Sequence, residues 1–223
     1  VADIRIDGAG KKVTRSDNCR VSDLSVSSDN LTFTYEAKSL PYPIDTSYYD
    51  NEKHTQADAL SVIPFMDEMN YEGLSVSGLS DGYYGLTIGG EFIGRFTARE
   101  LERGINMALL QNTPQYKQAM KIRQMNEERW LKERKMREFY WVEYNLMRKT
   151  GMLWACDEAA VDTLRKYRPH DIFLQWNGDL WLQYMHKGIR EDCVNEQQDL
   201  VDRIYEQNKP IPLQIEIKKF TDL

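Results

Sequence analysis

The stretch from Thr113 to Gly151 constrains the fold more than any other part of this 223-residue sequence. Threonine followed by proline is a typical helix start, with threonine as the N-cap and proline in the first turn, and no breaker follows until the glycine. We therefore predict one long helix near 114–149, roughly 50 Å long at about 1.5 Å per residue. Arg129 and Glu133 interrupt its apolar face, so its middle is predicted to face solvent or a partner.

The predicted long helix is also rich in charge. Between Lys117 and Lys149 it carries ten Lys or Arg and five Glu. Glu–Lys and Glu–Arg pairs at three- and four-residue spacing indicate a solvated face, although a docking arm for an acidic surface remains open. Near its end the helix places four residues on one predicted face: Met136, Tyr140, Tyr144 and Met147.

Residues 1–96 are predicted to form a β-rich part with a short helix near 57–70. Leu31, Phe33 and Tyr35 alternate at period two, as in a strand with one wet face, and residues 1–40 as a whole suggest a small antiparallel sheet. Pro64 is expected to break or kink the short helix. The Gly-Gly pair in "LTIGGEFIG" predicts a tight hairpin, because glycine tolerates positive φ at both turn positions.

Residues 97–223 are predicted to be mainly helical. Thr97 and Glu100 match a capping box, in which each side chain accepts from the backbone N–H of the other residue. Asn177-Gly178 suggests a turn, and alternating apolar residues indicate a closing strand near 211–220. The predicted class is therefore α+β, with small antiparallel sheet units, a long helix and a mainly helical C-terminal part, which is also compatible with one compact domain.

Composition excludes several functions. The net charge of −6 and a pI near 5.2 argue against a nucleic-acid partner. No apolar run approaches the roughly 20 residues of a membrane span, and no signal peptide is visible. Because the sequence starts with Val1 rather than methionine, we expect that it has been trimmed or excised from something longer.

Few residues have the spacing of known catalytic or metal sites. Cys19, Cys156 and Cys193 are far apart and form no C-x-x-C pair, so no metal and no cofactor are predicted, and buried free thiols are favoured over one disulfide. The three histidines, His54, His170 and His186, are expected at the surface or in caps. No G-x-S-x-G, H-E-x-x-H or phosphate-binding glycine motif is present, so no catalytic residue is assigned.

An aromatic cluster is the best local indication of a binding surface. Trp176, Trp181 and Tyr184 lie close together in sequence, and aromatic rings contact sugars through the same apolar faces that fill protein cores. Asn177 adds a polar group that can orient a hydroxyl-rich ligand. We treat these four residues as candidate substrate contacts, while packing between helices remains the alternative.

Five fragments then resemble a known family. "ALSVIPF", "LSVSGL", "YYGLTIGG", "IGRFTARELERGIN" and "TPQYKQA" occur in this order over about residues 57–119. The series resembles the C-terminal region of bacterial GDSL-type (SGNH) hydrolases. The resemblance implies a serine esterase or acylhydrolase as the parent protein, an ester or carbohydrate-linked acyl group as substrate, and a periplasmic or secreted location.

The catalytic motifs of that family are missing from this sequence. Gly178-Asp179 is followed by leucine rather than serine, and no histidine has an aspartate three residues before it. The resemblance therefore implies an accessory region that is inactive by itself, with the catalytic SGNH domain of the same parent chain as its partner. Two alternatives stay open: a stand-alone carbohydrate-binding or protein-interaction module, and an enzyme of another type that uses dispersed carboxylates.

Overall fold

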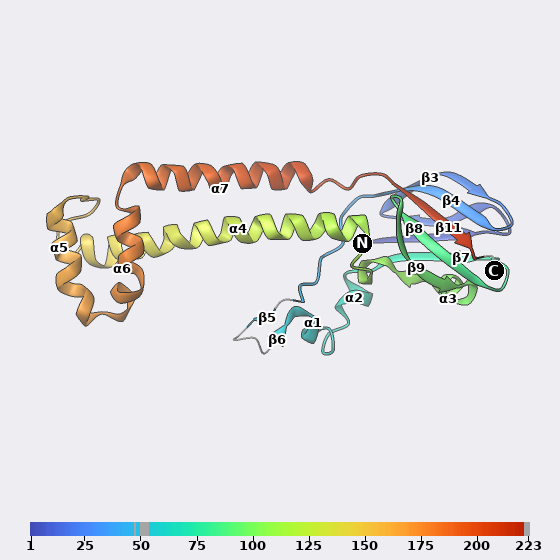
Figure 1. Cartoon of the computed structure of the whole chain (residues 1–223), viewed down its shortest axis with the longest axis horizontal. Helices are drawn as coiled ribbons and strands as arrows, with labels where there is room; N and C mark the ends of the chain where they lie inside the picture. The colour runs from blue at the N-terminus through green and yellow to red at the C-terminus, as the bar shows by residue number, and fades with distance from the viewer. Residues whose placement is uncertain (47, 50–53, 221–223) are drawn as a thin grey trace. The chain divides into compact units, whose positions relative to one another are not determined.

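The computed structural model describes residues 1–46, 48–49 and 54–220. The chain forms two compact units, one of Val1–Arg123 with Gln207–Leu223 and one of Gln124–Glu206. The first, the β unit, holds two antiparallel-rich sheets, and the second, the helical unit, holds the long helices (Figure 1). The predicted α+β class is confirmed. The division predicted after residue 96 stays a prediction.

The first sheet of the β unit has four strands in the order β10 (Ile105–Asn106), β7 (Glu72–Ser77), β1 (Ala2–Asp7) and β2 (Lys12–Asp17). β1 pairs with β2 in antiparallel fashion but with β7 in parallel, with Ile4 opposite Leu74. The strands of residues 1–40 are divided between this sheet, which holds β1 and β2, and the second sheet. The single antiparallel sheet predicted for these residues is therefore wrong. Alternation shows which face of a strand is buried, but it carries no information about a partner about 70 residues away.

The second sheet has five strands in the order β3 (Cys19–Val26), β4 (Asn30–Ala37), β11 (Leu213–Lys219), β8 (Tyr83–Ile88) and β9 (Glu91–Thr97). The predicted closing strand is confirmed as β11, and it lies in the middle of the sheet. Ile215 is opposite Phe33 on one side and Ile88 on the other. These side chains share one core with Ile4 and Leu74 of the first sheet. The strands β1 and β11, far apart in the sequence, therefore contribute to the same core.

Local signals set the turns and caps of the β unit as predicted. Gly89 and Gly90 join β8 to β9 with φ of 59° and 83°, which is the conformation of a two-residue hairpin turn. Thr97 then caps α3 (Ala98–Arg103) through the predicted capping box with Glu100. The hairpin and the cap therefore form from a single short stretch of sequence.

Between β4 and β7, the described residues form only short elements. They are β5 (Tyr48–Tyr49), β6 (His54–Thr55), α1 (Gln56–Ala59) and α2 (Phe65–Glu68), and a 3-10 turn (Met107–Leu109) follows β10. The short helix predicted near 57–70 is divided into α1 and α2, and Pro64 stands directly before α2 as its N-cap residue. Proline therefore breaks this helix as expected.

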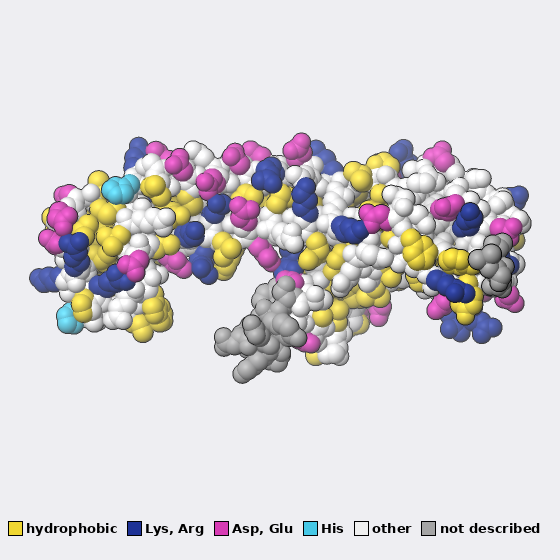
Figure 2. All heavy atoms as spheres, viewed as in Figure 1, with side chains coloured by type: hydrophobic (Ala, Val, Ile, Leu, Met, Phe, Trp, Pro, Cys, Tyr) yellow, Lys and Arg dark blue, Asp and Glu magenta, His cyan; other side chains and the backbone are white. Residues whose placement is uncertain are grey.

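The helical unit is built on α4 (Pro114–Val142) and α7 (Lys187–Gln207), which lie side by side (Figure 1). Lys132 of α4 contacts Glu196 of α7 at 2.6 Å. Between them in the chain come α5 (Glu158–Tyr167), a 3-10 turn (Arg168–His170) and α6 (Ile172–Tyr184). Side chains of both signs are interspersed over the surface of α7 (Figure 2), as expected for a solvated face.

The long helix does not continue as an α-helix to residue 149. After α4 the backbone makes a π-helical turn over Glu143–Met147, in which the Arg148 N–H donates to the carbonyl of Glu143 at 2.8 Å. The wider turn rotates the residues that follow it. Met136 and Met147 are buried, whereas Tyr140 and Tyr144 are exposed, so the face predicted for these four residues is not uniformly buried.

The turn predicted at Asn177-Gly178 is also wrong, because both residues lie inside α6. The cap of this helix is Asp171, whose Oδ1 accepts the N–H of Phe173 at 2.8 Å and that of Leu174 at 3.2 Å. A Cβ atom at position 178 would lie 3.2 Å from the Arg168 side chain. Glycine is therefore used here for close packing rather than for a turn.

The cysteines are all free: Cys19 and Cys193 are buried and Cys156 is exposed. None of the helices in the described part of the chain has the length and apolar character needed to cross a bilayer. The described residues also contain no group of three or more His, Cys, Asp or Glu side chains arranged to hold a metal ion.

Candidate aromatic site in the helical unit

The structure separates the four candidate residues of α6. Trp181 is completely buried, and Tyr184 is 6% exposed; burial also raises the pKa of its hydroxyl. Trp176 is 66% exposed and Asn177 is half-buried. The helix thus divides the cluster into a core face and a solvent face. Trp181 and Tyr184 fill the core, and ligand contact by Trp176 and Asn177 stays a prediction.

A buried glutamate organises the core behind these rings. Glu143 is 1% exposed, and each of its carboxylate oxygens accepts one N–H group. Oε1 accepts from the indole of Trp181 at 2.8 Å, and Oε2 accepts from the backbone of Trp154 at 2.9 Å. A buried carboxylate is costly unless both oxygens have hydrogen-bond partners. Glu143 therefore ties the π turn to α6 and to the loop before α5.

The backbone of Trp154 is strained. Its φ is +66°, in the left-handed region that large side chains rarely occupy. Such a conformation costs about 1–3 kcal/mol and persists only where the surroundings enforce it. Here the Glu143 carboxylate holds the Trp154 N–H, while the indole remains 44% exposed. Strain of this kind is concentrated at functional sites.

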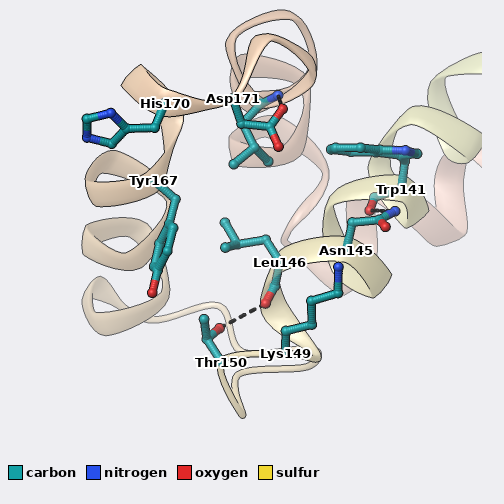
Figure 3. Close-up of a pocket in the computed structure, with 9 residues that line it drawn as sticks. Trp141, Asn145, Leu146, Lys149, Thr150, Tyr167, His170 and Asp171 are labelled. Atoms are coloured by element: carbon teal, nitrogen blue, oxygen red, sulfur yellow. Dashed lines mark hydrogen bonds between the residues drawn. The ribbon is translucent and has the colours of Figure 1, made fainter.

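The described part of the helical unit also contains a pocket of about 330 Å3 between the π turn and the segment from α5 to α6 (Figure 3). Its apolar walls come from Leu146 and Leu174, which are buried, and from the rings of Trp141 and Tyr167. Trp141 also contacts Phe173, with ring centroids 5.3 Å apart. The pocket has the size and the mostly apolar lining of a small-ligand site.

Polar residues also line the same pocket: Asn145, Lys149, Thr150, His170 and Asp171. The Thr150 hydroxyl donates to the carbonyl of Leu146 at 3.0 Å, and Asp171 caps α6, so these two groups already have partners. The Asn145 amide nitrogen also donates once, to the carbonyl of Trp141 at 2.9 Å. Lys149 forms no ion pair with any described residue. The pocket can therefore offer an aromatic surface together with an ammonium and an amide, which suits a ring-bearing ligand with carbonyl or carboxylate oxygens.

The histidines do not form a catalytic group in the described residues. The ring of His170 points away from the side chains on the opposite wall of the pocket (Figure 3). Neither His170 nor His186 hydrogen-bonds to a serine or carboxylate among the described side chains, and the side chain of His54 lies outside them. A serine hydrolase needs a histidine held between a nucleophile and a carboxylate. The described residues of this pocket hold no such histidine arrangement.

The β unit has its own buried polar cluster. Glu72 is fully buried, and its carboxyl group accepts from the Tyr35 hydroxyl at 2.8 Å and from the Gln115 amide at 3.3 Å. Burial raises the pKa of Glu72, and the pKa of Tyr35 is raised by burial and by the nearby Glu72. All three side chains are buried, and the cluster connects β4, β7 and α4.

The helical unit has relatives among known proteins. Residues 120–209 match the family model of the diltiazem deacetylase C-terminal helical domain. This range nearly coincides with the compact unit Gln124–Glu206. The comparison with curated proteins finds no match.

The whole chain also has a structural relative. The solved structure of BT4096, a gut microbial diltiazem-metabolizing enzyme, is 36% identical over 99% of this chain, with a TM-score of 0.92. This chain spans 50% of the length of that enzyme. The similarity therefore extends over nearly all of this chain and half of that enzyme.

Sequence reasoning missed Glu143 and Trp154. A single glutamate within a charged helix has the same local pattern as its solvated neighbours, so the sequence gives no signal that it is buried. Gly151 marks the end of the helix, but only the fold brings Trp154 back to Glu143. The missed residues are those whose roles depend on contacts across the helical unit.

Proposed function

We propose that this chain is the C-terminal accessory region of an ester hydrolase of the GDSL (SGNH) type. The catalytic domain of the same parent protein supplies the serine nucleophile and its histidine, and the chain by itself does not cleave esters. The observation that carries the proposal is the 36% identity over 99% of this chain to half of a diltiazem-metabolizing enzyme. The absent G-D-S and D-x-x-H motifs support it.

The substrate we propose is an acetyl ester on a ring-bearing molecule. The matching family model describes a diltiazem deacetylase, and the pocket beside Trp141 and Tyr167 is suited to an aromatic group. Binding energy gained on the non-reacting part of a substrate can be used to orient the ester. A periplasmic or secreted location belongs to the same proposal, because the family resemblance implies it.

The assignment can be tested by comparing two proteins, residues 1–223 and the product of the complete reading frame that contains them. Hydrolysis of p-nitrophenyl acetate and of diltiazem is measured for both. We expect turnover only for the longer protein, and a loss of at least about a thousandfold when the serine of its G-D-S motif is replaced by alanine. Turnover by residues 1–223 that disappears in His170→Ala or His186→Ala would show that the proposal is wrong.

The role of the pocket requires a separate measurement in the longer protein. Trp141→Ala removes an aromatic wall, and we expect KM for an aromatic acetyl ester to rise about tenfold while kcat changes little. Trp130→Ala is the matched control, because Trp130 is exposed and contacts Arg134 and Arg137 rather than the pocket. Equal KM values for the two variants would leave the hydrolase assignment intact but remove the pocket from substrate binding.

A further inference from the structure

A second hollow in the helical unit lies between the end of α4 and the start of α7. It has a volume of about 360 Å3, and Tyr140 and Trp154 form its aromatic wall. Its polar groups come from α7: Lys187, Arg190, Glu191 and Asn195. Neither the family model nor the relative's description assigns a role to this hollow.

Three energetically unfavourable local features together hold the Trp154 ring partly exposed. The Trp154 backbone is left-handed, the preceding helix contains a π turn, and the Glu143 carboxylate is buried to hold the Trp154 N–H. Each costs free energy, and both backbone strain and π turns are frequent at functional sites. Burial of a tryptophan in the core would offset this free-energy cost, but Trp154 remains 44% exposed. Its exposed face is therefore the feature that the local structure maintains.

The surrounding rings fix the orientation of the Trp154 indole. Phe139 stacks on it with an interplanar angle of 29° and a centroid distance of 6.4 Å. Tyr140 and Tyr144 meet it edge-to-face, each at 6.0 Å, and the two tyrosines are 39% and 49% exposed. A ring held on several sides loses little freedom when a ligand stacks on it. The result is a rigid and partly exposed aromatic platform.

The charges beside the platform already have partners. The Arg190 guanidinium lies 4.8 Å from the Phe139 ring centroid and donates to the carbonyls of Tyr184 and Met185 at 2.6 and 2.7 Å. Lys187 pairs with Glu191 at 3.4 Å. Lys187 and Glu191 therefore compensate each other, while the Arg190 guanidinium keeps its charge and is held by the two carbonyls and the Phe139 ring. The available groups of the hollow are aromatic faces together with amide, ammonium and carboxylate hydrogen-bonding groups.

We propose that this hollow binds a neutral saccharide. A sugar ring stacks on the exposed face of Trp154, because the C–H groups of a pyranose match an apolar aromatic surface. Its hydroxyl groups exchange hydrogen bonds with Asn195 and with the Lys187–Glu191 pair, which can donate and accept. The saccharide site is thus centred on Trp154 and Tyr140, not on the α6 cluster predicted from sequence.

The test is a titration of the 223-residue protein with neutral cello-, xylo-, malto- and chitooligosaccharides, followed by tryptophan fluorescence and calorimetry. We expect at least one series to give saturable binding. Trp154→Gly and Tyr140→Ala should each weaken it by about tenfold or more. Trp130→Phe is the matched control and should retain the affinity, because it lies outside the hollow.

Trp154→Gly suits this test because glycine accepts the positive φ without strain, so loss of binding is separated from loss of folding. A far-UV spectrum and an unfolding curve for each variant check this point. The proposal is overturned if no oligosaccharide in the panel binds, or if Trp154→Gly retains the affinity. It is also overturned if only Trp176→Ala abolishes binding, because the α6 cluster would then be the site.

Discussion

The β unit and the helical unit differ in what determines their structure. The β unit contains ten of the thirteen glycines, and its turns and caps form from neighbouring residues such as Gly89, Gly90 and Thr97. The helical unit contains all five tryptophans, and its organisation depends on Glu143, which joins three separate segments. The difference teaches that the turns and caps of the first unit follow local rules of sequence, whereas the arrangement of the second unit depends on tertiary contacts around one carboxylate.

The strongest way to break this comparison is to remove that carboxylate. Glu143→Ala leaves the N–H groups of Trp181 and Trp154 buried without acceptors and opens a cavity, so we expect it to lower the free energy of unfolding by about 3–4 kcal/mol. Glu143→Gln keeps one acceptor oxygen and should cost about 2 kcal/mol. Urea unfolding followed by tryptophan fluorescence reports the helical unit, because every tryptophan lies there.

Far-UV circular dichroism of the same samples provides the control, since it also reports the strands of the β unit. If the tryptophan and strand signals shift together, the two units unfold as one cooperative system. If Glu143→Ala unfolds like the unmodified protein, Glu143 does not organise the helical unit and the comparison fails.

Glu72 allows the comparison to be sharpened through pH. Burial raises its folded-state pKa, so the folded protein binds this proton more tightly than the unfolded chain does. Stability from this group is therefore fully present below the ordinary carboxyl pKa, and it is lost as pH rises through the raised folded-state value. The hydrogen bonds from Tyr35 and Gln115 oppose the shift by lowering the pKa, but burial is the larger effect.

Glu72→Gln should remove this pH dependence and raise stability at neutral pH by about 1–2 kcal/mol, because a neutral amide replaces a buried charge. Gln115 Oε1 has no hydrogen-bond partner in the described structure, and after an amide flip it can accept from the new side chain. Unfolding is measured across pH for both proteins, with Gln115→Ala as a control that removes the neighbouring amide. A variant with the same pH profile as the unmodified protein would contradict the assignment.

Much of the β unit could be predicted because its signals are local. Each of these signals depends only on residues a few positions away in the sequence: the hairpin glycines, the Thr97 cap, the Pro64 break and the closing strand. The pairing of β1 with β7 and the central place of β11 could not be predicted, since alternation identifies a buried face but no partner. Strand partners are chosen by the shared core rather than by the strand itself.

The candidate site was less predictable, because its geometry also depends on contacts between residues that are far apart in the sequence. The aromatic residues of α6 were found by composition, but composition cannot separate the buried Trp181 from the exposed Trp176. Gly178 suggested a turn, although its role is close contact with Arg168. The π turn and the conformation of Trp154 depend on Glu143, whose burial has no local signature.

A smaller effect tests the local rules of the β unit. Thr97→Ala removes the side chain that accepts the N–H of Glu100 at 3.1 Å, and we expect a loss of about 1 kcal/mol, as for other helix caps. Thr97→Ser keeps the hydroxyl and is the matched control. Hydrogen exchange of the α3 amides measures the change directly. Similar protection in the alanine and serine variants would mean that packing, and not the cap, holds this helix.

The smallest expected effect is the difference in stability between two variants of Trp154, the strained residue of the helical unit. Its sign is the reverse of the usual one. Trp154→Ala and Trp154→Gly both remove the indole, so they lose the same ring contacts. Alanine must still adopt a φ of +66°, whereas glycine adopts it freely. We therefore expect the glycine variant to be more stable than the alanine variant by about 0.5–1 kcal/mol, the reverse of their order in ordinary helical or extended backbone. Urea unfolding followed by the remaining tryptophans measures the difference. If alanine is equal or better, the backbone relaxes once the ring is gone, and the strain belongs to the indole packing rather than to the hold of Glu143 on the Trp154 N–H.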